Sequence, residues 1–366
     1  EQYSTSHLRK SSIRMLARSI TENKSHHGEH YITRNRSEYF KMFYSAAGGG
    51  VIIALMALNK IHIASLGFGE FTTSFLAGLN YGLGFMLIHM LHCTVATKQP
   101  AMTAASFAEQ VDSNEGSKAV DNKLAKLLID VCRSQSVAVF GNVSIAVLLA
   151  AGIAWGYAYT HGQPLLNEAV TAYQLKSIEI FTQPTLWYAA IAGVWLFCSG
   201  IIAGFFDNRS DYLNLRQRLP FNPFLRKIMR PQPRRRLAAY IHKHYGSLMG
   251  NFIFGMLLGM TGYFGHLFGL PLDIRHVAFS SANLGYAAIS GHTDIFTFML
   301  GLASVLAIGM VNLVVSFSLA LAVALRSRGT RLGSMRNLLK SFWSQVKANP
   351  LILLYPVQVN NKENTK

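Results

Sequence analysis

The sequence predicts an all-α, polytopic membrane protein, a bundle of about six transmembrane helices with one further short helix that is re-entrant or interfacial. Composition gives the first two observations behind this fold class. Of the 366 residues, 51% are hydrophobic and only 14% are charged, and the mean hydropathy is +0.25, whereas soluble domains carry about 25% charged residues. The third observation is that six apolar stretches are each long enough to cross a bilayer. A soluble globular enzyme is therefore excluded.

Each predicted span is bounded by charged residues or by Gly, Pro and Asn, and none contains Asp or Glu. A spanning helix needs roughly 20 mostly apolar residues, because every backbone N–H and C=O group must be paired inside the hydrocarbon. The stretches that meet this condition are residues 42–59, 72–95, 136–159, 186–206, 248–270 and 296–324. They define a transmembrane domain over residues 42–325, between a cytoplasmic N-terminal segment (1–41) and a basic cytoplasmic tail (326–366).

The distribution of basic residues predicts the orientation. Of the 34 Lys and Arg residues, 31 lie in the segments on one side of the predicted spans and three lie on the other side. Lys and Arg are retained on the cytoplasmic side of a membrane, so we expect a bacterial inner-membrane protein with both termini in the cytoplasm. Topology alone also explains most of the formal charge of +17. We therefore expect contacts with the bilayer and its anionic lipids, and no DNA binding by this part of the chain.

Two cytoplasmic segments carry basic clusters. Residues 8–20 form an amphipathic pattern with four basic residues, which predicts a helix that lies on anionic lipid or packs against another domain. The loop 207–247 contains a basic run in which Pro231 and Pro233 are expected to prevent a continuous helix. We expect its three consecutive arginines to contact lipid headgroups or a cytoplasmic protein partner; they are Arg234, Arg235 and Arg236.

The segment 271–290 is apolar but too short to span. Its run VAFSSANLGYAAI has 13 residues and would reach only about 20 Å as a helix, short of the roughly 30 Å core. It either enters the bilayer and returns or lies flat on the external surface, and the sequence favours neither. In the first case its polar residues would line a protein cavity; they are Asp273, Arg275, Ser280 and Asn283.

His89 and His92 lie three residues apart in the second span, which predicts that both imidazoles share one helix face. Two histidines at this spacing can bind a transition metal, but no carboxylate accompanies them. We expect no metal and no cofactor, and we interpret both histidines, with Asn80, as part of a polar seam between helices. The sequence lacks GxSxG, Walker and HExxH motifs and any pair of carboxylates within the spans, so it favours a protein that is not an enzyme.

Small residues predict close helix packing. Four GxxxG pairs occur within the spans, at Gly78/Gly82, Gly200/Gly204, Gly255/Gly259 and Gly265/Gly269. A weak internal echo also relates residues 48–80 to residues 250–283. Both stretches begin on the cytoplasmic side, so a repeat of this kind would be parallel, and chance is the better explanation.

Four passages together resemble one known family. They are HYITRNRSEYFKMFYSAAGGG (30–50), ATKQPAMTAAS (96–106), LPLDIRHVAFSSANLGYA (270–287) and VNLVVSFSLALAVALRSRG (311–329). The chain is similar, over about residues 26–350, to the bacterial multi-pass membrane proteins named site-specific recombinase. Members of that family carry a cytoplasmic region ahead of the membrane part, so the resemblance implies that this chain is the C-terminal membrane half. It supplies no catalytic residue.

The family name can be compared with the residues present. A tyrosine recombinase needs Arg, His and Tyr side chains in a soluble domain, and the loop 207–247, about 40 residues long, is far shorter than a normal domain. Its candidates are Arg216, Arg218, His242 and Tyr245. The sequence favours a protein that moves, or assists the movement of, a small or lipidic substrate. A membrane scaffold for a cytoplasmic partner or for a missing N-terminal domain, and DNA recombination, stay as alternatives.

Overall fold

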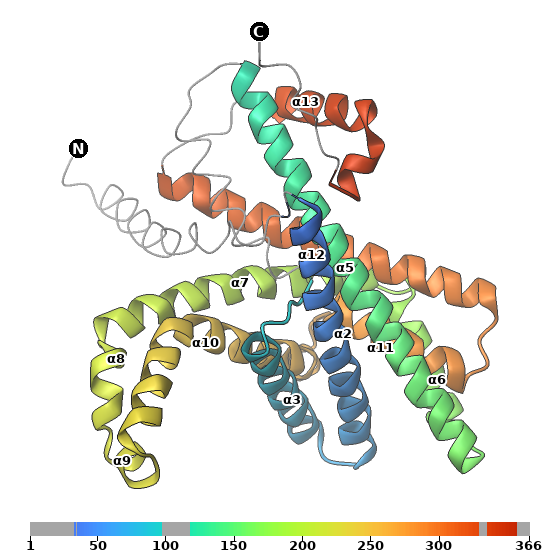
Figure 1. The fold of residues 1–366 in the computed structure, drawn as a ribbon. Helices are drawn as coiled ribbons and strands as arrows, with labels where there is room; N and C mark the ends of the chain where they lie inside the picture. The colour runs from blue at the N-terminus through green and yellow to red at the C-terminus, as the bar shows by residue number, and fades with distance from the viewer. Residues whose placement is uncertain (1–32, 34, 97–117, 329–334, 357–366) are drawn as a thin grey trace.

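The computed structural model describes residues 33, 35–96, 118–328 and 335–356, and the regular structure in these parts of the chain is helical. Six helices are long and apolar enough to cross a membrane (Figure 1), and each contains most or all of one predicted span. They are α2 (Arg36–Ser65), α3 (Glu70–Met90), α5 (Lys118–His161), α7 (Thr185–Tyr212), α10 (Pro231–Phe268) and α12 (Ile295–Arg328). The predicted all-α bundle is confirmed. The expected helix at 8–20 lies outside the described residues.

Alternate helix ends fall on the same side, because the six helices follow one another in the chain. We call the side on which α2, α5 and α10 begin the basic side, since its segments hold 31 of the 34 Lys and Arg residues. The other side is called the opposite side. Short helices lie at both sides: α6 (Glu168–Ile178), α8 (Leu215–Arg218), η2 (Leu219–Phe221), α9 (Pro223–Ile228), α13 (Met335–Ala348) and η3 (Pro350–Leu353).

Local sequence explains where several helices begin. The Asn35 side chain accepts a hydrogen bond from the Glu38 N–H (2.9 Å), and this caps α2. The expected break in the basic loop lies at residues 229–230, between α9 and α10. Pro231 and Pro233 then occupy the first turn of α10, where a backbone N–H has no partner within the helix. The two prolines therefore start a helix that continues into the fifth span.

The short helix between the fifth and sixth spans is α11 (Val277–Ser290), and it lies inside the bundle. Eleven of its 14 residues are buried, and it packs against α5, α12, α6 and α2. The alternative of a flat helix on the external surface is therefore wrong. The alternating Ser, Ala and Gly residues of α11 are small enough to let the surrounding helices approach on all sides.

The core is centred where α3 crosses α10. A Cβ atom at Gly82 would lie 2.8 Å from the Phe252 O atom, and one at Gly255 or Gly259 would overlap the α3 backbone at Gly82 or Gly78. The predicted close packing of these two GxxxG pairs is confirmed, and it makes α3 and α10 antiparallel. Aromatic rings fill the space beside this crossing; they belong to Tyr81, Phe85, Phe254 and Phe279.

A second layer extends beyond the spans on the basic side. The first turns of α5 pack their apolar face on α13, where Leu124 and Leu127 meet Leu338. One turn further along α5, Arg133 pairs with Asp130 (2.7 Å) and donates to the Ile352 O atom (3.3 Å). These contacts fix the segment after α12 against the start of α5.

Candidate functional site

Two adjoining cavities open on the opposite side, where α3 begins and α10 ends. The first, the polar cavity, has a volume of about 500 Å³ and lies among α2, α3, α6, α10, α11 and residues 272–276. The second, the apolar cavity, has a volume of about 760 Å³ and lies between α2 and α6. The two share four lining residues, Lys60, Ala64, Tyr173 and Gln174. The two cavities therefore adjoin at these residues.

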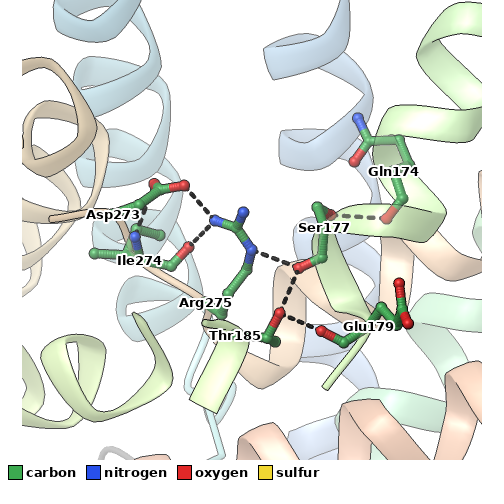
Figure 2. A network of polar contacts seen from close by, with 7 residues as sticks. All are labelled: Gln174, Ser177, Glu179, Thr185, Asp273, Ile274 and Arg275. Atoms are coloured by element: carbon green, nitrogen blue, oxygen red, sulfur yellow. Dashed lines mark hydrogen bonds and ion pairs between the residues drawn. The ribbon is translucent and has the colours of Figure 1, made fainter. Parts of the chain in front are cut away.

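Arg275 lines the polar cavity and is held there by a network of polar contacts, which Figure 2 shows. Its Nε atom donates to the Ser177 O atom (2.6 Å), and its Nη1 atom donates to an Asp273 carboxylate oxygen (2.6 Å) and to the Ile274 O atom (2.7 Å). The guanidinium lies 5.3 Å from the centre of the Tyr188 ring. No hydrogen bond is formed by Nη2 within the described residues. An anchored arginine with donors left over is suited to bind an anion.

Lys60 supplies a second cation from the last third of α2. It lines both cavities, and Asp273 and Arg275 line the polar cavity with it. Among the described residues the carboxylates nearby are engaged elsewhere, because Asp273 pairs with Arg275 and Glu70 pairs with His266 (2.6 Å). Since a charge away from bulk water is costly unless it is compensated, Lys60 favours an anionic occupant of the cavity.

The distribution of charge along the chain singles out the same two residues. Only three Lys or Arg residues lie on the opposite side, namely Lys60, Lys176 and Arg275. Two of these three line the polar cavity. The few cations on this side are thus concentrated at one cavity, whereas those on the basic side are spread over long segments.

The apolar cavity has a different lining. Its wall is mostly aliphatic, from the last turns of α2 and from the segment that leads into α6; the aliphatic residues are Leu55, Leu58, Ile61, Ala64, Leu165, Leu166, Ala169 and Val170. Lys60 and Gln174 line the polar cavity as well. A cavity lined by charged side chains therefore adjoins a cavity lined mostly by aliphatic side chains.

The structure brings together four of the residues that the sequence singles out. Asp273, Arg275, Ser280 and Asn283 all line the polar cavity. Asn80 lies elsewhere: its side chain donates to the Met56 O atom (2.8 Å) and accepts from Asn59 (2.9 Å), so it joins α3 to α2. The residues expected to form one polar seam are thus found in two places, some in the polar cavity and Asn80 in the contact between α2 and α3.

His89 and His92 do not share a helix face, and this expectation is wrong. The helix α3 ends at Met90, and His92 has a left-handed backbone (φ 57°) that turns the chain away from the helix axis. The Cys93 N–H closes the turn on the Ile88 O atom (2.9 Å), as in a Schellman motif. His89 instead meets His244 of α10, with 3.1 Å between Nε2 and Nδ1. No group of three metal-ligating side chains occurs among the residues that the structure describes.

The basic loop does not assemble a recombinase-like set of side chains. Arg235 and Arg236 are exposed and Arg234 is half-buried, all three in the first turns of α10. His242 lies 3.0 Å from the Ser210 Oγ atom, and the Tyr245 ring packs edge-on against Phe206. Both side chains thus join α10 to α7.

Sequence reasoning missed Lys60, Tyr173 and Gln174 as cavity residues. Lys60 directly follows an apolar stretch, so by sequence it is indistinguishable from a charge that ends a span. Tyr173 and Gln174 belong to α6, whose place beside α2 depends on tertiary contacts. The available signal was the rarity of Lys and Arg on the opposite side.

Comparison with known proteins gives one match. A family model described as site-specific recombinase matches residues 1–356. No curated protein and no solved structure matches the chain. The match covers nearly the whole sequence and agrees with the resemblance carried by the four sequence passages. The chain, with its six membrane-spanning helices and paired cavities, belongs to the site-specific recombinase family.

Proposed function

We propose that this membrane protein binds an amphipathic anion and assists its movement across the bilayer. The observation that carries the proposal is the pair of adjoining cavities that share Lys60, one lined by charged side chains and the other by aliphatic ones. Lys60 and the Nη2 atom of Arg275 would hold a carboxylate or phosphate head. The apolar cavity would hold the hydrocarbon tail.

The energetics support an anion over a cation or a neutral solute. A hydrogen bond to a charged group contributes about 1.5–3 kcal/mol, roughly a 10- to 100-fold change in affinity. Burial of an alkyl tail adds about 0.8 kcal/mol for each CH₂ group removed from water. A tail that is already in lipid gains little of this, so the polar cavity would determine which amphiphile is selected.

Binding can be mapped directly. The full chain in nanodiscs is incubated with a photoactivatable fatty acid, irradiated and digested, and the labelled peptides are identified by mass spectrometry. We expect label on the peptides that contain residues 55–66 and 165–174, and at least a tenfold lower yield for Lys60→Gln. Lys176→Gln is the matched control, because Lys176 lies on the same side and lines neither cavity. An equal yield for all three proteins would refute the assignment.

Movement is measured in liposomes. A single-chain phosphate with a fluorescent label, such as labelled lysophosphatidate, is equilibrated with both leaflets, and dithionite then quenches the outer leaflet. We expect reconstituted protein to accelerate loss of the protected pool, with Lys60→Gln slower and Lys176→Gln unchanged. Binding without transfer would instead support the membrane scaffold. Sequence-selective DNA binding by the chain, with no amphiphile bound, would support recombination.

A further inference from the structure

Two buried asparagines form the same set of hydrogen bonds in the two halves of the chain. Asn142 of α5 donates to Ala46 O and to Thr94 O and accepts from the Ala96 N–H. Asn312 of α12 donates to Ala189 O and to Arg275 O and accepts from the Val277 N–H. Each amide thus binds one helix carbonyl and two groups of a second segment. In that segment the carbonyl and the N–H belong to residues two apart, Thr94 and Ala96 in one case and Arg275 and Val277 in the other. When the two sets of hydrogen bonds, which we call the amide centres, are superposed in this way, α2 is structurally equivalent to α7 and α5 is equivalent to α12.

Glycine contacts and burial follow the same equivalence. A Cβ at Gly50, four residues after Ala46, would lie 2.8 Å from Asn142 O and 3.1 Å from Ile145 Cβ. A Cβ at Gly193, four residues after Ala189, would lie 3.1 Å from Asn312 O and 2.8 Å from Val315 Cβ. Six positions are buried in both α2 and α7 at a constant offset of 143 residues, from Met42 and Thr185 to Met56 and Ser199. Eight are buried in both α5 and α12 at an offset of 170 residues.

The third pair of helices is α3 and α10, with an offset of 177 residues. Gly78 and Gly82 correspond to Gly255 and Gly259, and the two helices end in equivalent turns. His92 (φ 57°) corresponds to Gly269 (φ 62°). The closing bond from the Cys93 N–H to Ile88 O (2.9 Å) corresponds to that from Leu270 to Gly265 (2.8 Å).

The repeat is inverted. Gly78 packs on Gly259 and Gly82 on Gly255, so the equivalent helices α3 and α10 cross antiparallel and exchange partners under a two-fold rotation. Consecutive spanning helices also alternate in direction, so α2 and α7 run in opposite senses. The parallel echo considered for the sequence (48–80 with 250–283) does not correspond to these equivalences. Inverted repeats of this kind place substrate sites at the repeat interface in many transporters, with alternating access between the repeats.

The two repeats differ in the contact between their first and second helices. On the basic side α7 and α10 are in contact, where a Cβ at Gly250 would lie 2.9 Å from Ala203 Cβ and the Gly246 N–H donates to Asp207 (2.9 Å). On the opposite side the equivalents of Ala203, Asp207 and Gly250 all line the polar cavity; they are Lys60, Ala64 and Thr73. One half is therefore closed where the other is open.

We infer that the cavity has a second entrance on the basic side, lined by Ser199, Ala203, Asp207, Gly246 and Gly250, and that the two entrances open alternately. In the alternate state α2 and α3 close as α7 and α10 now do, and Ala64 approaches Gly69 as Asp207 now contacts Gly246. The described arrangement is the state open to the opposite side. This inference rests on the proposed function and deepens it by giving the bound anion a route out, and the first of its two tests needs no ligand.

The test uses a wedge at the closed entrance. In a background with Cys93, Cys132 and Cys198 replaced by Ser, a single cysteine at Ala64 or at Ala203 is labelled with a membrane-impermeant maleimide in nanodiscs. Gly250→Leu should separate α7 from α10. We expect labelling of Ala64→Cys to fall at least fivefold and labelling of Ala203→Cys to rise at least fivefold. Gly152→Leu is the control, because a Cβ there meets no atom within 4 Å.

A second measurement avoids the wedge, which could impair folding. The pair Ala64→Cys/Gly69→Cys, equivalent to Asp207 and Gly246, should form a disulfide under mild oxidation in the same background, and the oxidised protein should lose the photolabelled peptides of the amphiphile assay. No disulfide, or wedge-induced labelling that changes in the same direction at both positions, would overturn the inference. If opposite labelling changes are found but no amphiphile binds, the inverted repeat stands and the proposed substrate class fails.

Discussion

Replacement of Asn312 by leucine removes a buried amide of the second repeat that forms three hydrogen bonds. Its amide forms hydrogen bonds of 2.7, 3.0 and 3.0 Å with Ala189 O, Arg275 O and the Val277 N–H. The side chain is fully buried, so water cannot replace these partners. Leucine has a similar volume, and the effect should therefore come from the lost hydrogen bonds.

The expected loss can be worked from these three contacts. Hydrogen bonds between membrane helices contribute about 0.6 kcal/mol each on average, which gives about 1.2 kcal/mol for the two carbonyl contacts. The Val277 N–H begins α11 and would be left buried without an acceptor, which costs about 1–3 kcal/mol. We expect the free energy of unfolding to fall by about 2–4 kcal/mol, and a loss of similar size for Asn142→Leu, because the two centres match bond for bond.

The assay is equilibrium unfolding by SDS in mixed micelles, followed by circular dichroism. Val314→Leu is the control, since Val314 lies on the same helix with its side chain exposed, and its midpoint should not move. If Asn312→Leu unfolds at the same midpoint as this control, the amide centres do not hold the repeats together and the reasoning fails.

Four further predictions follow from other contacts. Gly82→Leu should destabilise by about 1–3 kcal/mol in SDS unfolding, because its side chain would overlap Phe252, whereas Gly156→Leu should be neutral. Leu338→Ala should lower hydrogen-exchange protection of α13 by about 2 kcal/mol, and exposed Leu339→Ala should not. Hydrogen bonds from Thr297 and Phe296 hold the pKa of Asp294 below its ordinary value. The ionised carboxylate should therefore stabilise the protein at pH 7, and this stabilisation should be lost as the pH falls through the folded-state pKa. The measurement compares SDS unfolding of the wild type and of Asp294→Ala at a series of pH values. Single cysteines at residues 65, 170 and 292 should be labelled only from outside the cell, and labelling from the cytoplasm would refute the orientation.

The sequence was sufficient for the elements that depend on length and apolarity. The six spans and the short helix α11 follow from the roughly 20 residues that a membrane helix needs. The end of α3 was misjudged because His92 adopts a left-handed conformation that is usual for glycine, and the apolar pattern continues past it. The chain there is fixed by the Ser45, Thr94 and Asn142 contacts, which are tertiary.

The cavity and the inverted repeat could be predicted from the sequence only in part, because both depend on tertiary packing. Asp273 and Arg275 are near neighbours in the chain and could be paired from sequence, but Lys60 reaches them only through the packing of α2. The inverted repeat is hidden because equivalent helices share few identical residues. The connections also differ in length, with four residues between α2 and α3 and 18 between α7 and α10.

The length of α5 gives it a mechanical property. At 44 residues and 1.5 Å per residue it is about 66 Å long, more than twice the hydrocarbon core. Its first 18 residues precede the predicted span and reach about 27 Å beyond it, where they carry α13. A tilt of about 10° within the bilayer would displace the far end by about 5 Å, by the geometry of a rigid helix. The helix is therefore a lever arm, and any change of state inside the membrane is magnified where α13 is attached.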